Sequence, residues 1–186
     1  MIYEVFGPFE IPYKDGTVLK TTNSTSTQKD MLLQINEFWT QVEGKHKGLS
    51  DACGCYVFSV RTSKGCKPWY IGKASKQSFR KECFTQDKIL KYGGVSNNRA
   101  GTPLLHFIAR LTNSDRFSTP SKTRTGHLDI DFLEGSLIRL AVDRNDDLIN
   151  CQGTKMYRDI FVPGIFNSKP GKLHVAAKSL RDILIK

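Results

Sequence analysis

The chain has 186 residues, 39% of them apolar, and a formal net charge of +10. This length suits one domain with additions, and the apolar share is sufficient for a core. The sequence contains no run of about 18 apolar residues, which excludes a conventional membrane-spanning helix. It also shows no N-terminal apolar stretch with a basic flank, so we expect a cytoplasmic protein without membrane association.

The positive charge is concentrated in one stretch of the chain. Residues 61–125 hold 14 Lys and Arg residues and three acidic ones, a net charge of +11, so the rest of the chain together carries −1. A concentrated basic region is typical of proteins that bind a polyanion, and DNA is the first candidate. A basic surface that only keeps the protein soluble is the alternative interpretation.

The first 50 residues are predicted to form an extension of the domain. Residues 1–20 are expected to be extended, with a turn at Asp15-Gly16. Residues 27–44 begin with a sequence that resembles a capping box and carry apolar side chains at helical spacing, which predicts an amphipathic helix. Packing on the core is the simplest role for its apolar face, and binding of a protein partner is the alternative.

Two β-favouring segments follow, at 55–60 and around 69–71, with a Gly-containing turn between them. They predict an antiparallel hairpin. Tyr56 and Tyr70 lie on its neighbouring strands, so we expect their hydroxyl groups to converge. Gly54 and Gly72 would let a DNA backbone approach closely.

A helix is predicted from Ser75 to about Leu90, with Arg80 on its first turns, and residues 92–103 have the composition of a loop. Residues 104–111 fit both helical and strand spacing. We favour a strand there because a two-stranded hairpin needs a third strand for stability. The expected sheet therefore has three strands.

The rest of the chain is predicted to contain two more helices. Residues 112–127 are polar and basic, as in a flexible loop. Asp131 is expected to cap a helix that carries Glu134 on an early turn, and the chain closes with a helix near 175–184. The predicted fold class is α+β, with a core at 51–152, a basic insertion at about 85–127, an N-terminal extension at 1–50 and a C-terminal extension at 153–186.

The five cysteines, at 53, 55, 66, 83 and 151, do not form a recognisable framework. An odd number without a signal peptide argues against disulfide bonds and for a reducing compartment. Their spacing fits no common zinc site. We therefore expect buried free thiols.

Several polar residues fit the chemistry of phosphodiester cleavage, which needs placement, charge neutralisation and an activated water. The Glu134 carboxylate, together with phosphate oxygens, can hold Mg²⁺ or Mn²⁺, and Arg80 can bind the scissile phosphate through two hydrogen bonds. A tyrosine becomes a usable base beside a cation, and Lys73 lies three residues after Tyr70. Each of these residues alone also fits an ordinary structural role, so the prediction depends on their joint order and spacing.

In order and spacing, these motifs resemble the GIY-YIG nuclease family over residues 54–150. The resemblance is carried by Gly54-Cys55-Tyr56, Tyr70-Ile71-Gly72 with Lys73, Arg80, the run from Glu134 to Arg139, and Asn150. Two positions depart from the family pattern: Cys55 replaces an aliphatic residue, and Phe84 stands where many members place a His or Tyr near the phosphate.

The resemblance implies a small three-stranded antiparallel sheet flanked by helices, and a Mg²⁺-dependent endonuclease that acts on DNA. It implies that Tyr56 or Tyr70 activates water, that Arg80 stabilises the phosphate and that Glu134 binds the metal. The predicted catalytic residues are thus Tyr56, Tyr70, Lys73, Arg80, Glu134 and Asn150. The predicted DNA contacts are Lys76, Lys81, Lys88, Lys91, Arg99, Lys122 and Arg124.

The leading functional prediction is therefore a metal-dependent DNA endonuclease of restriction, mobile-element or repair type. One active site of this kind cuts one strand, so double-strand cutting would need a homodimer or two visits. A nucleic-acid-binding module without catalysis is the alternative. A protein-interaction domain built on the helix at 27–44 is a third interpretation, which the charge concentration in 61–125 disfavours.

Overall fold

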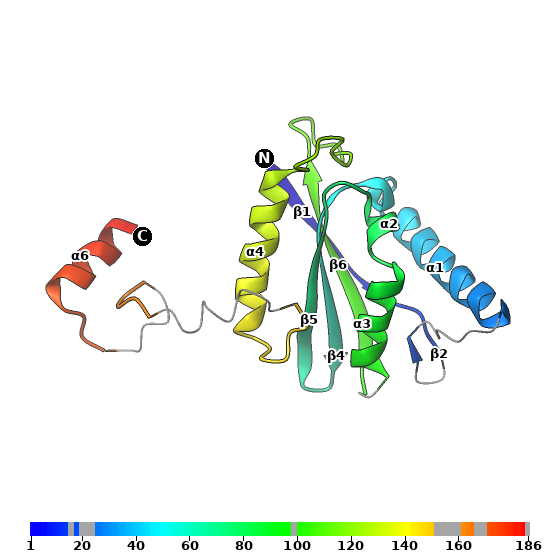
Figure 1. Cartoon of the computed structure of the whole chain (residues 1–186), viewed down its shortest axis with the longest axis horizontal. Coiled ribbons are helices and arrows are strands. Elements are labelled where there is room, and N and C mark those ends of the chain that lie inside the picture. Colours follow the sequence, from blue (N-terminus) through cyan, green and yellow to red (C-terminus); the bar gives the residue numbers. More distant parts are fainter. Residues whose placement is uncertain (15–16, 19–24, 98–99, 151–160, 166–170, 185–186) are drawn as a thin grey trace. The chain divides into compact units, whose positions relative to one another are not determined.

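The structure is a computed structural model. It describes residues 1–14, 17–18, 25–97, 100–150, 161–165 and 171–184. The chain divides into two compact units, Met1–Asn150 and Cys151–Lys186. The first unit is an antiparallel sheet flanked by helices, which confirms the α+β prediction (Figure 1). Among the described residues, no helix has the length and apolar character needed to cross a membrane.

The sheet has four strands: β1 (Ile2–Glu10), β4 (Gly54–Thr62), β5 (Gly65–Ala74) and β6 (Thr102–Leu111). Their spatial order is β1-β6-β4-β5, and all neighbours are antiparallel. The hairpin and the strand at 104–111 are thus confirmed, whereas the predicted count of three was wrong. The N-terminal segment supplies the fourth strand, because Phe6 and Phe9 of β1 are buried in the main core while its backbone pairs with β6.

The main core lies between one face of the sheet and the helices α1 (Thr25–Lys45), α2 (Phe79–Glu82) and α3 (Gln86–Ser96), with the short 3₁₀ helix η1 (Leu49–Asp51). Alternate side chains of a strand point to one face, so Tyr56 and Phe58 of β4 both enter this core. Phe58 stacks on Tyr92 of α3 with ring centroids 4.3 Å apart. The predicted helix at 27–44 is confirmed as α1, and Phe38 and Trp39 bury its apolar face.

The opposite face of the sheet is covered by α4 (Leu128–Val142), as Figure 1 shows. Cys53, Cys55 and Ile130 form a small second core there, which Leu133 and Leu137 complete. Because helices cover both faces, β4 is apolar on both sides. The described cysteines are free. Cys53, Cys55 and Cys83 are buried as expected, whereas Cys66 is exposed, and Cys151 lies outside the described residues.

Helix boundaries in the middle of the chain differ from the prediction. The helix expected at 75–90 is broken into α2 and α3, and α3 continues to Ser96 inside the expected loop. Thr85 has an extended backbone between the two helices, and this break lets both Phe79 and Tyr92 reach the core. The segment 85–127, expected as an insertion, supplies α3 and the central strand β6, so it is built into the first unit.

The remaining elements are short or lie in the second unit. A two-stranded sheet of β2 (Tyr13–Lys14) and β3 (Thr17–Val18) follows β1, and the turn expected at Asp15-Gly16 lies outside the described residues. The predicted C-terminal helix is confirmed as α6 (Val175–Leu184).

Candidate functional site

A cleft of about 560 Å³ lies at the C-terminal end of β5, the outer strand beside β4. It is lined by Tyr70 and Lys73 of β5, Glu82 and Lys88 of α2 and α3, Asp131 and Glu134 of α4, and Lys76 and Thr125 of the loops, among others. Successive strand residues point to opposite faces, so the edge of β5 carries Tyr70 toward α3 and Lys73 toward α4. The cleft therefore brings together three of the predicted catalytic residues, namely Tyr70, Lys73 and Glu134.

Lys73 bridges two carboxylates inside the cleft. Its Nζ lies 2.9 Å from Glu134 Oε2 and 3.0 Å from Asp131 Oδ1. Burial lowers the pKa of Lys73, but its hydrogen bonds to Glu134 and Asp131 outweigh that effect and raise the pKa above its ordinary value. Lys73 therefore stays protonated at neutral pH.

Asp131 also belongs to this site, although the sequence pattern predicted it only as a helix cap. In the structure α4 begins at Leu128, so Asp131 lies in the first turn and shares a face with Glu134. The signal was present, because residues three apart on a helix are neighbours.

Tyr70 is buried at the base of the cleft, with lysines of α3 at its ring. Lys88 Nζ and Lys91 Nζ lie 5.0 and 5.3 Å from the ring centroid. Burial lowers the pKa of Lys88, but its interactions with Tyr70, Asp87 and Glu82 outweigh burial, so the pKa is raised. Two positive charges thus adjoin the tyrosine.

Tyr56 lies beneath the cleft and does not line it. Its ring packs against Gly72 on the paired strand: a Cβ at Gly72 would lie 2.2 Å from Tyr56 Cζ. Gly54 likewise faces protein, because a Cβ there would lie 2.1 Å from the Ile108 carbonyl oxygen. These glycines are required for packing within the protein, which corrects the expectation that they make room for a DNA backbone.

The Tyr56 hydroxyl is fully buried and forms no hydrogen bond of normal geometry within the described residues. Burial raises its pKa far above the ordinary value for tyrosine, and the neighbouring Tyr92 adds to this effect. The rings of Tyr56 and Tyr70 are neighbours, with centroids 6.1 Å apart. Of the two tyrosines, Tyr70 is the one that a ligand in the cleft can contact.

Arg80 and Asn150 also lie outside the lining of the cleft. The Arg80 guanidinium lies 5.5 Å from the Trp39 ring centroid, and its Nε donates to Ser50 Oγ at 3.3 Å. Asn150 accepts a hydrogen bond from the Ile71 amide at 3.1 Å and donates one to the Ile71 carbonyl. Asn150 therefore pairs with the free edge of β5 and supports the strand that carries Tyr70 and Lys73.

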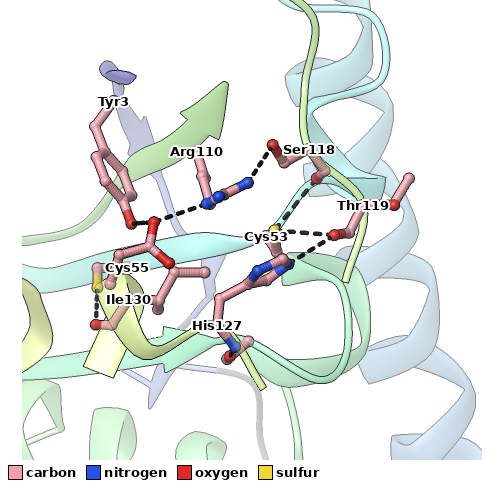
Figure 2. A network of polar contacts seen from close by, with 10 residues as sticks. Tyr3, Cys53, Cys55, Arg110, Ser118, Thr119, His127 and Ile130 are labelled. Carbon is pink, nitrogen blue, oxygen red and sulfur yellow. Dashed lines mark hydrogen bonds and ion pairs between the residues drawn. The ribbon is translucent and has the colours of Figure 1, made fainter. Parts of the chain in front are cut away.

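A polar network fixes the N-terminal end of α4 to the sheet (Figure 2). Asp129 Oδ2 accepts hydrogen bonds from the Tyr3 hydroxyl and from Arg110 Nε, both at 2.7 Å. Burial raises the pKa of Asp129, but the bonds from Arg110 and Tyr3 outweigh burial and lower it. Strands β1 and β6 thus set the position of the helix that presents Asp131 and Glu134.

The loop at 112–127 is tied down next to this network, as Figure 2 also shows. The Cys53 thiol contacts the Ser118 and Thr119 carbonyl oxygens, each at 3.3 Å, and the His127 ring lies 3.1 Å from the Thr119 carbonyl. The His127 amide donates to Ser75 Oγ at 2.7 Å, so Ser75 anchors this loop and does not cap a helix as predicted. Burial raises the pKa of Cys53 to about 11, which leaves the thiol protonated at neutral pH.

The predicted DNA contacts surround the cleft unevenly. Lys76 and Lys88 line it, and Lys91 lies beside Tyr70. Lys81 is exposed on α2, and Lys122 and Arg124 are exposed on the loop next to Thr125. Arg99 lies outside the described residues.

Asp131 and Glu134 are the carboxylates of the cleft that could hold a divalent metal ion. Within the described residues, no cluster of three or more His, Cys, Asp or Glu side chains has a metal-binding arrangement. Mg²⁺ is often held by one or two protein carboxylates together with phosphate oxygens, so this pair fits such an ion. The Lys73 ammonium group lies between these two carboxylates, so the space between them already accommodates a positive charge.

No family model, curated protein or solved structure matches the chain. The function must therefore be inferred from the cleft itself.

Proposed function

We propose that the protein is a metal-dependent endonuclease of the GIY-YIG type that hydrolyses phosphodiester bonds in DNA. The observation that carries the proposal is the cleft, where Tyr70, Lys73 and Glu134 meet beside further lysines. The resemblance implies a small antiparallel sheet flanked by helices, and the antiparallel strands β6, β4 and β5 with the Glu134 helix packed on them support the proposal in this respect.

The residues of the cleft have complementary roles in this proposal. Glu134, with Asp131, would hold Mg²⁺ or Mn²⁺, which when bound supplies charge neutralisation and an activated water. Tyr70 would orient the attacking water and, when ionised, accept its proton, and Lys88 would face the phosphate from the other side. Lys73 would keep the two carboxylates in place and balance their charge.

A second candidate function is binding of nucleic acid without cleavage. Two observations favour it: Lys73 already pairs with both carboxylates, and Arg80 is directed toward Trp39 and not into the cleft. The same basic cleft would serve this function.

Plasmid nicking by wild type and by Glu134→Ala, in Mg²⁺ or Mn²⁺ and in EDTA, distinguishes the two functions. We expect metal-dependent nicking that falls by about 10²-fold or more in Glu134→Ala, because the loss of a group that stabilises transition-state charge typically costs this much. Glu37→Ala is the matched control, since Glu37 is exposed on α1, away from the cleft.

Nicking by Glu134→Ala at the wild-type rate would refute the nuclease assignment. Wild type that binds DNA but nicks neither methylated nor unmethylated plasmid would favour the non-catalytic module.

A further inference from the structure

A second hollow, of about 810 Å³, lies at the other end of β5, where the turn joins it to β4. Three of the side chains that line it are cationic, namely Lys64, Lys67 and Arg144, and none is acidic. We call these three residues the hairpin surface. None of them was among the predicted DNA contacts.

Within the part of the chain that the structure describes, Lys64, Lys67 and Arg144 form no ion pair. By contrast, Lys73 and Lys88 of the cleft are each paired with carboxylates. An anionic ligand could therefore bind the hairpin surface without breaking an internal ion pair.

Contacts within the fold position the Lys67 side chain and the backbone next to Arg144. Lys67 Nζ lies 5.2 Å from the ring centroid of Trp69, a cation–π contact that restrains the side chain. The buried Asn145 donates a hydrogen bond to the Pro68 carbonyl at 2.7 Å, which fixes the adjacent Arg144 against β5. The nearest acidic neighbour in sequence, Asp143, is paired with Arg139.

The cleft and the hairpin surface lie along the same outer strand. Lys67 and Lys73 are six residues apart, which corresponds to about 20 Å at a rise of about 3.3 Å per residue. This length matches about six successive phosphates of one DNA strand, which follow one another about every 3.4 Å along the helix axis. A DNA duplex parallel to β5 is therefore long enough to reach both the cleft and the hairpin surface, and it would pass over residues 145–150, which bond to the outer edge of β5.

We propose that the hairpin surface is a second phosphate-binding site. It holds the DNA duplex about six base pairs from the phosphodiester bond that lies in the cleft. The inference rests on the proposed nucleic-acid function and adds the direction in which the DNA runs, along β5. It does not require that the protein cuts DNA.

The first test compares two double variants that lose the same charge. Lys64→Gln/Lys67→Gln removes two cations of the hairpin surface, and Lys29→Gln/Lys47→Gln removes two exposed cations at the ends of the α1 region. Binding to a duplex of about 20 base pairs is measured by fluorescence anisotropy in EDTA over a range of salt concentrations. Each lost phosphate contact lowers the slope of log K against log[salt] by about 0.9.

We expect the hairpin variant to bind at least about fivefold more weakly than the control variant, with a slope lower by about two. Equal weakening in the two variants would overturn the proposal, because the effect would then be general electrostatics. Urea unfolding of both variants checks that they are folded.

The exposed free thiol of Cys66, on the same hollow, provides a second test. We expect a saturating concentration of DNA duplex to slow the alkylation of Cys66 severalfold. Mass spectrometry of the peptide that contains Cys66 measures this rate. An unchanged rate would overturn the proposal. Protection of Cys66 without any nicking would support the second phosphate-binding site and refute the nuclease. Nicking without protection of Cys66 would refute the second phosphate-binding site and leave the nuclease proposal standing.

Discussion

At the scale of single residues, the two tyrosines of the sequence motifs occupy different environments. The Tyr56 ring fills the space over Gly72, and burial of its hydroxyl raises the pKa of this group. Tyr70 lines the cleft, with two lysines at its ring. A proton acceptor must reach the water that it activates, so within the proposed nuclease we assign this role to Tyr70 and not to Tyr56.

Substitution of each tyrosine by phenylalanine tests this difference. We expect Tyr70→Phe to lower the nicking rate by about 10²-fold or more, a typical effect of removing an acid–base group. Tyr56→Phe should nick at close to the wild-type rate. It should also keep its stability toward urea, because its hydroxyl forms no hydrogen bond of normal geometry among the described residues. Loss of nicking in a folded Tyr56→Phe protein would assign the proton transfer to Tyr56.

At the scale of elements, the position of α4 depends on strands that are distant in sequence. Tyr3 of β1 and Arg110 of β6 both donate to Asp129, which lies two and five residues before the carboxylates of the cleft. Hydrogen bonds to a charged group contribute about 1.5–3 kcal/mol each in favourable cases. The polar network therefore links the outer edge of the sheet to the candidate site.

Asp129 makes the stability of the fold sensitive to acid. Its pKa is lower in the folded protein than in the unfolded chain, so the unfolded chain binds more protons as the pH falls. The stabilisation is complete above the unfolded pKa of about 3.9 and is lost as the pH falls through the folded value. We expect the free energy of unfolding of Asp129→Asn to fall less than that of wild type over this range.

Urea unfolding at a series of pH values measures this effect. Asp51→Asn is the control. Asp51 is exposed on η1, and its side chain forms no hydrogen bond or ion pair with the described residues. An Asp129→Asn protein with the pH dependence of wild type would show that the network does not contribute to acid sensitivity.

At the scale of the whole molecule, the Lys and Arg residues concentrated in 61–125 are distributed over separate basic regions of the first unit. In the cleft, Lys73 and Lys88 are paired with carboxylates. Lys122 and Arg124 are exposed on the loop at 112–127, next to Thr125 of the cleft. These loop cations can attract DNA without taking part in the chemistry.

We therefore expect Lys122→Ala/Arg124→Ala to weaken DNA binding and to lower its salt slope by about two, since each phosphate contact contributes about 0.9. The nicking rate at saturating DNA should remain near that of wild type. Anisotropy and single-turnover nicking measure the two quantities. Unchanged binding at low salt would show that this loop does not contact DNA.

The features that the sequence determined by itself are those with a local cause. Helical spacing predicted α1 and the C-terminal helix, and β-favouring segments around a turn predicted the β4–β5 hairpin. The sequence also grouped Tyr70, Lys73 and Glu134 by the order of their motifs. Tyr70 and Lys73 share β5, whereas Glu134 reaches the same cleft from α4, which α2, α3 and β6 separate from the hairpin along the chain.

Other features were decided only by tertiary packing. The pairing of β1 with β6, the burial of Tyr56 over Gly72 and the direction of Arg80 toward Trp39 all depend on contacts between residues far apart in the chain. A local pattern states which face of an element is apolar, but not which partner will cover it. That choice is made by the packing of the complete core, and it determines which of the candidate residues reach the cleft.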